Sequence, residues 1–478
     1  MPAPPDTMPA GHSQQPPRAP LLDGAFRREA RTLLRLGGPM MATQMCIMGM
    51  GFIDTAMAGH YDAVDLAGVA LGGSVLWPVF MLLTGMNMAL TPMIAQLDGS
   101  GRRGESGALT RQGLWIAAAA ALLAILLLGN ARLLFDLAGV DAGAAAIAER
   151  YLDAVCWGLP ASYLYVTLRY MSEGLGKTQP PMLIAVLALP LNALLNWMFI
   201  YGHFGAPALG GEGCGWATAA VWWAQLLIML GVVRLPYFRA TGLLDRLDPP
   251  TAAQVAAILR LGVPIGLTVF VEMMLFSVIN FLVAEFGVVQ LAAHSIAGNV
   301  NWATYVIPMS LGSAASIRIG YLIGSDDLAG ARTVVRTAVT LSVGYALVVS
   351  ALLIAARRLV AGIYTDDPAV IALAANLMLF IAVYQLLDDT QATMTGALRG
   401  FKDTRMPMVY SLLGWWLLAL PLGVVLGLGS FGLPRLEVYG FWIGLTVGLA
   451  IVATLIGTRL HRTSSSDLRI RRLAAAGV

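Results

Sequence analysis

Three carboxylic acids lie inside long apolar stretches of the 478-residue sequence, namely Asp54, Glu272 and Asp388. Glu272 is the only charged residue between Arg260 and Glu285. A carboxylate at the depth of a lipid bilayer is costly unless it is protonated, paired with another group or hydrated in a cavity. The simplest interpretation of a chain that keeps three such acids is that it uses them to carry protons or cations.

Polar residues accompany Asp388 at helical spacing. Tyr384 lies four residues before it and Gln391 three residues after it, so all three would share one face of a helix. Asp389 would point about 100° away from that face. We favour Asp388 as the interior acid, although Asp389 could take that role, or the two acids could share a proton.

Amide side chains offer partners for Asp54. Asn192 and Asn196 are four residues apart in another apolar stretch, so they share one helix face and could donate hydrogen bonds to Asp54. His294 is a further polar residue inside an apolar stretch. A single histidine in a membrane is more often a packed hydrogen-bonding residue than a proton relay, and we keep it as a secondary candidate.

The composition is that of a membrane protein with many spans. Hydrophobic residues make up 58% of the chain and charged residues only 12%, whereas soluble domains carry about 25% charged residues. The net charge of +3 arises from basic residues scattered over short loops rather than from one patch. We therefore expect a lipid bilayer as the surroundings and no nucleic acid as a partner.

Enzymatic and ATP-hydrolysing motifs are weak or missing. The segment GLGKT (174–178) resembles only the end of a Walker A sequence, and no HExxH motif is present. The three cysteines, Cys46, Cys156 and Cys214, have no spacing typical of a metal site. We expect no enzymatic activity and no cofactor, and we do not expect nucleotide hydrolysis to drive this chain.

Twelve apolar segments are long enough to cross a bilayer, which takes about 20 helical residues. The predicted spans are 34–58, 66–97, 108–129, 146–171, 180–201, 212–234, 254–284, 290–322, 334–355, 369–396, 406–428 and 436–458. The predicted organisation is a disordered cytoplasmic tail (1–30), an amino-terminal six-helix lobe (31–236), a cytoplasmic inter-lobe loop (237–252), a carboxy-terminal six-helix lobe (253–458) and a cytoplasmic tail (459–478).

Basic residues predict the orientation. With the amino terminus in the cytoplasm, only five of the 30 Lys and Arg residues fall on the outer side. These five are Arg132, Arg150, Arg357, Arg358 and Arg435. Because positively charged loops remain in the cytoplasm, this distribution favours both termini inside.

The two halves of the chain resemble each other. RLGGPM (35–40) corresponds to RLGVPI (260–265), and DLAGVAL (65–71) corresponds to QLAAHSI (290–296) at the same offset of 225 residues. Each half holds six predicted spans, so both halves enter the membrane in the same sense. Transporter sites tend to lie between such repeats, near the middle of the membrane.

At this point the sequence resembles the multidrug and toxic compound extrusion (MATE) family, and its NorM-like branch in particular. Five features carry the resemblance: FIDTAMAGH (52–60), the otherwise uncharged helix with Glu272, AAHSIAGN (292–299), IPMSLGSAASIRIGYLIG (307–324) and YQLLDDTQATMTGALRGFKDT (384–404). The resemblance implies an all-α polytopic membrane protein with twelve transmembrane helices in two pseudo-symmetric six-helix lobes around a central cavity. It also implies a monomer, and we expect it in the inner membrane of a bacterium.

The function that the resemblance implies is a secondary antiporter. It would expel organic cations or amphipathic toxins in exchange for Na⁺ or H⁺. Asp54 and Asn196 match the family's amino-lobe acid and its partner. Glu272, Tyr384 and Asp388 match the carboxy-lobe cation cluster, which would hold Na⁺ if Na⁺ is the coupling ion. Asp389 departs from the family pattern, which commonly has a small or apolar residue there.

Other functional classes remain as alternatives. A lipid-linked oligosaccharide flippase would have similar spans, but a basic cavity is expected for its pyrophosphate. A channel fits two asymmetric halves with scattered acids less well than alternating access does. An integral membrane enzyme would need a nucleophile–base pair or a metal constellation, and none is visible.

Overall fold

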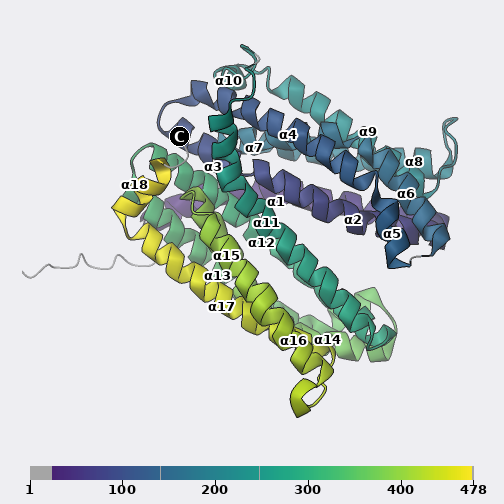
Figure 1. The fold of residues 1–478 in the computed structure, drawn as a ribbon. Helices are drawn as coiled ribbons and strands as arrows, with labels where there is room; N and C mark the ends of the chain where they lie inside the picture. The colour runs from purple at the N-terminus through teal and green to yellow at the C-terminus, as the bar shows by residue number, and fades with distance from the viewer. Residues whose placement is uncertain (1–23, 140, 247, 476–478) are drawn as a thin grey trace, which may run out of the picture.

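The computed structural model describes residues 24–139, 141–246 and 248–475. Residues 1–23 of the predicted amino-terminal tail therefore lie outside the described residues, whereas residues 24–30 form the beginning of the first helix. The described chain is built of helices, without a β-strand. Figure 1 labels the helices of the two lobes. The amino-terminal lobe contains α1 (Gly24–Tyr61), α2 (Ala63–Asn87), α3 (Leu90–Gly99), α4 (Ser106–Leu128), α5 (Ala131–Ala138), α6 (Ala142–Cys156), α7 (Leu159–Gly174), α8 (Gln179–Tyr201) and α9 (Gly211–Val232).

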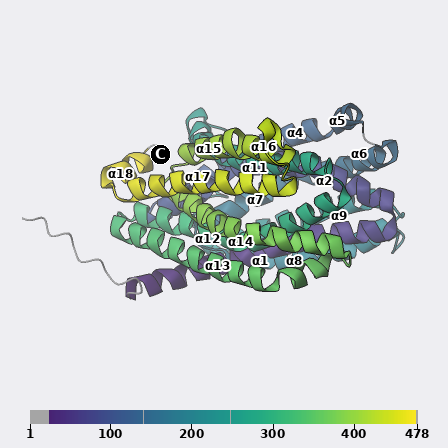
Figure 2. The same ribbon diagram turned by 90° about the horizontal axis from the view of Figure 1, so that it is seen from below.

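A short helix, α10 (Pro236–Arg239), leads to the carboxy-terminal lobe. That lobe contains α11 (Ala252–Ala284), α12 (Val288–Gly324), α13 (Leu328–Tyr364), α14 (Pro368–Gly400), α15 (Arg405–Leu412), α16 (Leu420–Leu428), α17 (Val438–Ser464) and α18 (Asp467–Ala475). Figure 2 shows the same molecule from below, with α18 at the end of α17. The predicted fold class is confirmed, since the chain forms two all-helical lobes.

Eleven helical segments of the described chain are long and apolar enough to cross a membrane. The fourth predicted span, 146–171, is not a single helix, because Trp157 and Gly158 separate α6 from α7. Pro160 lies in the first turn of α7, where its missing N–H does no harm. The apolar segments predicted where the chain crosses the membrane, but they did not predict the break between α6 and α7.

A distortion without a break lies between α15 and α16. Residues 413–419 form a π-helical turn just before α16, whose second residue is Pro421. Proline has no N–H to donate and its ring clashes with the carbonyl four residues earlier, so a local widening of the helix accommodates it. The helix thus continues through the predicted span 406–428 with a distortion at its centre.

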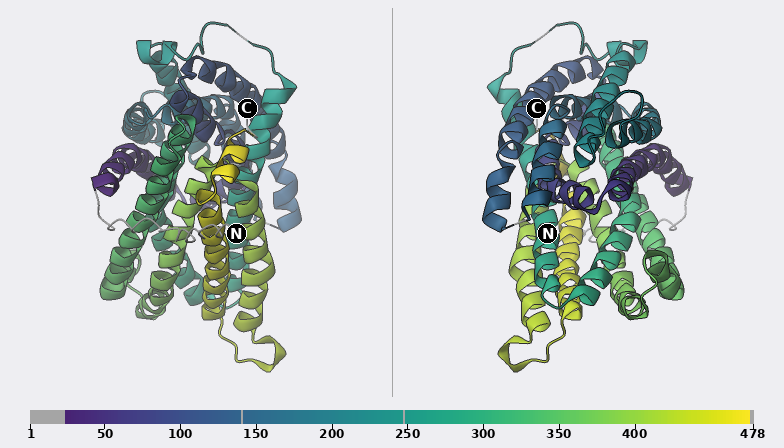
Figure 3. Two further views of the ribbon diagram at one scale, coloured as in Figure 1. Left: turned by 90° about the vertical axis from the view of Figure 1, so that its left-hand side faces the viewer. Right: turned by 90° about the vertical axis from the view of Figure 1, so that its right-hand side faces the viewer.

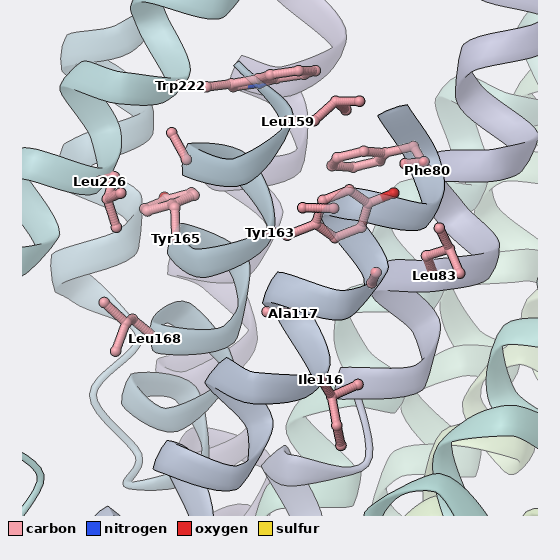
Figure 4. Close-up of a cluster of buried hydrophobic side chains, with 14 of the residues drawn as sticks. Phe80, Leu83, Ile116, Ala117, Leu159, Tyr163, Tyr165, Leu168, Trp222 and Leu226 are labelled. Carbon is pink, nitrogen blue, oxygen red and sulfur yellow. The ribbon is translucent and has the colours of Figure 1, made fainter. Parts of the chain in front are cut away.

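Each lobe has its own hydrophobic core. In the amino-terminal lobe, the Phe80 ring stacks on Trp222 with 5.6 Å between ring centroids and meets the Tyr163 ring at 5.3 Å. Figure 4 shows these rings among aliphatic side chains from α2, α4, α7 and α9, including Leu83, Ile116, Leu159 and Leu226. Interdigitated aromatic and aliphatic groups hold the helices of one lobe in a fixed arrangement.

The lobes meet at one end of the molecule, which we call the terminal end because α1 begins there and α17 ends there. Figure 1 shows the two bundles converging near α10 and α18 and diverging toward α5 in one lobe and α16 in the other. A Cβ atom at Gly262 of α11 would lie 1.9 Å from the Met86 carbonyl oxygen of α2. One at Gly324 of α12 would lie 2.1 Å from the Gln96 carbonyl oxygen of α3. Glycine therefore permits the close approach of the two lobes.

Polar contacts fasten the terminal end as well. Arg318 of α12 forms two 2.8 Å hydrogen bonds with the Glu29 carboxylate of α1, so the first helix is tied to the opposite lobe. The side of the molecule where α1 begins is visible in Figure 3.

The predicted inter-lobe loop is docked on α4. Arg111 donates to the Asp248 carboxylate at 2.8 Å, and Gln112 donates to the Pro249 carbonyl oxygen at 3.1 Å. The Trp115 indole donates to the Asp248 carbonyl oxygen at 2.9 Å. The described part of this connection is therefore an ordered strap rather than a free linker.

Candidate ion-coupling sites

The first site surrounds Asp54, late in α1. Its carboxylate accepts hydrogen bonds from the Asn196 amide at 2.6 Å and from the Asn192 amide at 3.0 Å, both on α8. The Thr218 hydroxyl of α9 lies 3.4 Å from the other carboxylate oxygen. These donors are neutral, so they can orient the carboxylate without cancelling its charge.

The asparagine pair is itself ordered by the helix. Asn196 also donates to the Asn192 side-chain oxygen at 3.3 Å, as the four-residue spacing allows. Both asparagines are buried. The predicted contacts of Asp54 with Asn192 and Asn196 are present in the structure. Thr218 was not identified from the sequence, because no charged residue of α9 lies near it to draw attention to it.

The second site lies in the carboxy-terminal lobe around Glu272 and Asp388. Glu272 is half-buried on α11, and Asp388 is buried on α14. The two acids are close enough to interact electrostatically, and the Glu272 charge also acts on Tyr305 and Tyr384. Asn301 of α12 lies within reach of the Asp388 carboxylate.

Several polar atoms at this site lack a partner in the described chain. One Asp388 carboxylate oxygen, the Tyr384 hydroxyl and the Asn301 side-chain oxygen are buried without a hydrogen bond. Buried polar groups are nearly always satisfied by protein or by water. Oxygen atoms of this kind, gathered around two acids, are suitable ligands for a proton, a hydrated cation or Na⁺.

Trp442 of α17 connects two of the predicted residues. The Tyr384 ring meets the Trp442 ring edge-on with 5.7 Å between centroids, and the His294 ring is tilted by 58° against it, also with 5.7 Å between centroids. His294 is buried, and its Nδ1 atom has no hydrogen-bond partner in the described chain. The structure thus places His294 beside the acidic site through an aromatic contact rather than in direct contact with an acid.

Asp389 belongs to a different set of contacts. Its carboxylate accepts a 2.6 Å hydrogen bond from Gln385, whose own oxygen accepts from Thr304 at 2.9 Å. The Ser342 hydroxyl donates to the Asp389 carbonyl oxygen at 2.8 Å. As the helical period predicts, Asp389 faces another direction from Asp388.

Gln391 is the predicted residue that the structure links least to the acids. It is buried, as its place on α14 requires, but the described residues give its side chain no hydrogen bond to an acid. Sequence reasoning also missed Tyr305 and Trp442. Tyr305 follows Asn301 by four residues, and that spacing is the signal that would have placed it on the same face.

A resident metal centre has no support among the described residues, where no group of three His, Cys, Asp or Glu side chains could hold a metal ion. Glu272, Asp388 and Tyr384 offer two carboxylates and a phenol as oxygen ligands. A cavity of about 330 Å³ lies elsewhere, at the terminal end, and is lined by residues of α1 and of the α7–α8 connection.

A protein-family model and solved structures match most of the chain. The MatE family model matches residues 39–198 and 264–425. A crystal structure of the eukaryotic MATE transporter AtDTX14 is 21% identical, with a TM-score of 0.84 over 95% of this chain and 100% of that one. An outward-facing multidrug resistance MATE transporter of the MOP superfamily is 17% identical, with a TM-score of 0.83 over 94% and 97%.

A third similar structure is a MOP superfamily transporter from Pyrococcus furiosus. It is 18% identical, with a TM-score of 0.81 over 93% of this chain and 96% of that one. The reversed polarity of the binding pocket of that transporter suggests a different function for it. At these identities the three structures establish a common fold, and the charges of this chain's own sites must decide its substrate class.

Proposed function

The chain belongs to the MatE family of membrane transporters, and we propose that it is a secondary active multidrug efflux antiporter. In this proposal it expels organic cations or amphipathic toxins in exchange for Na⁺ or H⁺, without a cofactor and without enzymatic chemistry. It resides in a bacterial inner membrane as a monomer, with both termini and the terminal end on the cytoplasmic side.

One observation carries the proposal: Asp54, Glu272 and Asp388 lie within the helices without a basic counter-ion. The ion pairs of the described residues involve other acids. Acids without a fixed cation attract a mobile one, whether a proton, Na⁺ or a cationic drug.

The proposed mechanism is competition for these acids. A drug cation and the coupling ion would both neutralise the same carboxylates, so the binding of one favours release of the other. Each bound species shifts the equilibrium between inward- and outward-facing states only by its difference in affinity for the two. The divergence of the lobes away from the terminal end corresponds to a carrier open to the outside.

The acidic character of the sites argues against the flippase alternative. A pyrophosphate-linked substrate needs basic side chains within the lobes, whereas Glu272 and Asp388 would repel it. The transporter from Pyrococcus furiosus shows that the fold accepts pockets of different polarity. The sign of the charge is therefore the property on which the proposal depends.

Efflux of a fluorescent cation such as ethidium from proteoliposomes tests the proposal. A Na⁺ gradient and a pH gradient are imposed separately on the parent, Glu272→Gln and Asp388→Asn. We expect efflux driven by one of the gradients and a loss of at least about tenfold in both variants, because each removes a charge at which the ion binds. Equal efflux with and without gradients, by a parent that is folded and correctly inserted, would refute antiport.

A further inference from the structure

A basic site, distinct from the two acidic sites, lies at the terminal end of the molecule. The cavity of about 330 Å³ opens between the beginning of α1 and the connection from α7 to α8. Arg31 and Arg35 line it from α1, and Lys177, Thr178 and Gln179 line it from the other side. No acidic residue is among its lining residues.

The two arginines of this cavity are not neutralised within the described chain. Both are exposed and neither forms an ion pair there. Other arginines at the same end do so, as in the Arg318–Glu29 pair at 2.8 Å and the Arg169–Glu173 pair at 2.6 Å. Arg27 lies one helical turn before Arg31 on the same face of α1, because residues 27, 31 and 35 are spaced four apart.

The opposite wall is held rigidly. The Lys177 ammonium lies 4.2 Å from the centre of the Tyr237 ring, and the Tyr237 hydroxyl donates to the Leu175 carbonyl oxygen at 3.1 Å. The Ser172 hydroxyl donates to the Lys177 carbonyl oxygen at 2.6 Å. Lysine is thus fixed beside the cavity by an aromatic ring and not by a carboxylate, which leaves its charge available.

Apolar surface continues from the cavity along the helices. Leu34 of α1 is 60% exposed, and Leu183 and Leu187 of α8 are 56% and 58% exposed. Gln179, Leu183 and Leu187 are each four residues apart, so they follow one face of α8 from the cavity toward the centre of the predicted span. Figure 3 shows the beginning of α1 at the side of the molecule, where lipid can reach it.

We propose that this cavity binds the phosphodiester headgroup of an anionic phospholipid, whose acyl chains lie on the exposed leucines of α1 and α8. Basic pockets between helices at the cytoplasmic level of a membrane bind anionic headgroups. Three cations without a carboxylate provide the attraction, and the adjoining apolar track distinguishes a lipid from a free phosphate. The site is separate from the transport reaction and does not depend on the proposed antiport.

The bound lipid would brace α1 between the lobes. Arg31 and Arg35 would hold the helix to the α7–α8 connection through the headgroup, while Glu29 on the same helix holds Arg318 of α12.

Native mass spectrometry of the purified full chain in detergent tests the proposal. Phosphatidylglycerol and phosphatidylcholine with identical acyl chains are added at equal concentration. We expect the parent to retain phosphatidylglycerol in preference to phosphatidylcholine. The double variant Arg31→Gln/Arg35→Gln should retain at least about tenfold less phosphatidylglycerol than the parent, because it lacks two of the three positive charges. Arg31→Lys/Arg35→Lys should restore much of the retention.

A matched control removes two other charges from the same end. Arg234 and Arg239 are exposed and lie outside the cavity, so Arg234→Gln/Arg239→Gln should retain phosphatidylglycerol like the parent. Equal retention by both glutamine double variants would overturn the proposal. Displacement of the lipid by inorganic phosphate in millimolar excess would also overturn it, because the cavity would then be a site for soluble anions.

Discussion

At the scale of single residues, the two adjacent acids of α14 have different surroundings. Asp388 faces Glu272 and Tyr384, while the Asp389 carboxylate is engaged by Gln385. The spacing of the sequence predicted that they diverge, but it left open which of them would bind the coupling ion of the proposed antiport. Each acid keeps one buried carboxylate oxygen without a partner in the described chain, so the contacts favour Asp388 because it interacts with a second acid on another helix, Glu272.

Removing each acid in turn should therefore have unequal effects. We expect Asp388→Asn to reduce ion-driven efflux by at least about tenfold and Asp389→Asn to reduce it by less than about threefold, since an asparagine there can still accept from Gln385. Efflux from proteoliposomes at matched protein density measures both. Larger loss in Asp389→Asn would assign the coupling role to the acid that departs from the family pattern.

At this scale the sequence predicted the charged members of the candidate sites, because a charged residue inside an apolar stretch is easily recognised. It could not predict neutral partners such as Thr218, Tyr305 and Trp442, because hydroxyl and aromatic groups occur throughout membrane helices. Their roles depend on which faces of α9, α12 and α17 turn toward the acids, and tertiary packing decides that.

At the scale of elements, the carboxy-terminal end is more structured than its polar sequence suggested. The predicted tail begins at residue 459, whereas α17 continues to Ser464 and α18 follows it. Ile470 of α18 is buried, and the Lys402 ammonium donates to the Ala474 carbonyl oxygen at 3.2 Å. A single apolar residue among charges gives little signal in the sequence, although it is enough to dock a short helix on an existing core.

Lys402 should make the stability of this region depend on pH. It lies in the loop after α14, and burial lowers the pKa of its ammonium to about 8. The neighbouring Asp403 carboxylate is engaged by Arg459 at 2.6 Å and does not offset that burial. The unfolded chain keeps this proton up to a pKa of about 10.4, so between pH 8 and that value it binds more protons than the folded chain.

Stability should consequently rise with pH across that window. From pH 7 to pH 9 we expect a gain of about 1 kcal/mol in the parent and none of this gain in Lys402→Met, which has no proton to release. Thermal unfolding in detergent at pH 7, 8 and 9 measures the difference. Lys177→Met keeps Lys402 and should follow the parent, and a parent with the same pH slope as Lys402→Met would contradict the expectation.

At the scale of the whole molecule, glycines at the lobe crossing set how closely the two halves approach. A Cβ atom at Gly266 would lie 2.3 Å from the Leu82 carbonyl oxygen, and one at Gly262 would lie 1.9 Å from that of Met86. The repeat and the spans were predictable from the sequence. The state in which the lobes meet was not, because it depends on a balance between two packings of the same helices.

Gly262→Ala should shift that balance. Within α11 alanine is the better helix former by about 1 kcal/mol, so each lobe should remain folded. The added methyl group instead clashes with the backbone of α2 and disfavours closure at the terminal end. Distances between spin labels at Ser100→Cys and Ser325→Cys, in a background without the three native cysteines, measure the separation of α3 and α12 at that end.

We expect a longer and broader distance distribution in Gly262→Ala than in the parent, and the opposite lobe ends should approach each other if the two lobes move as rigid bodies. Gly231→Ala is the matched control, because nothing lies within 4 Å of a Cβ atom at that helical glycine. If both variants give the parent's distances, the helix crossing is not what holds this end closed, and the Arg318–Glu29 pair becomes the contact that must open for the carrier to face inward.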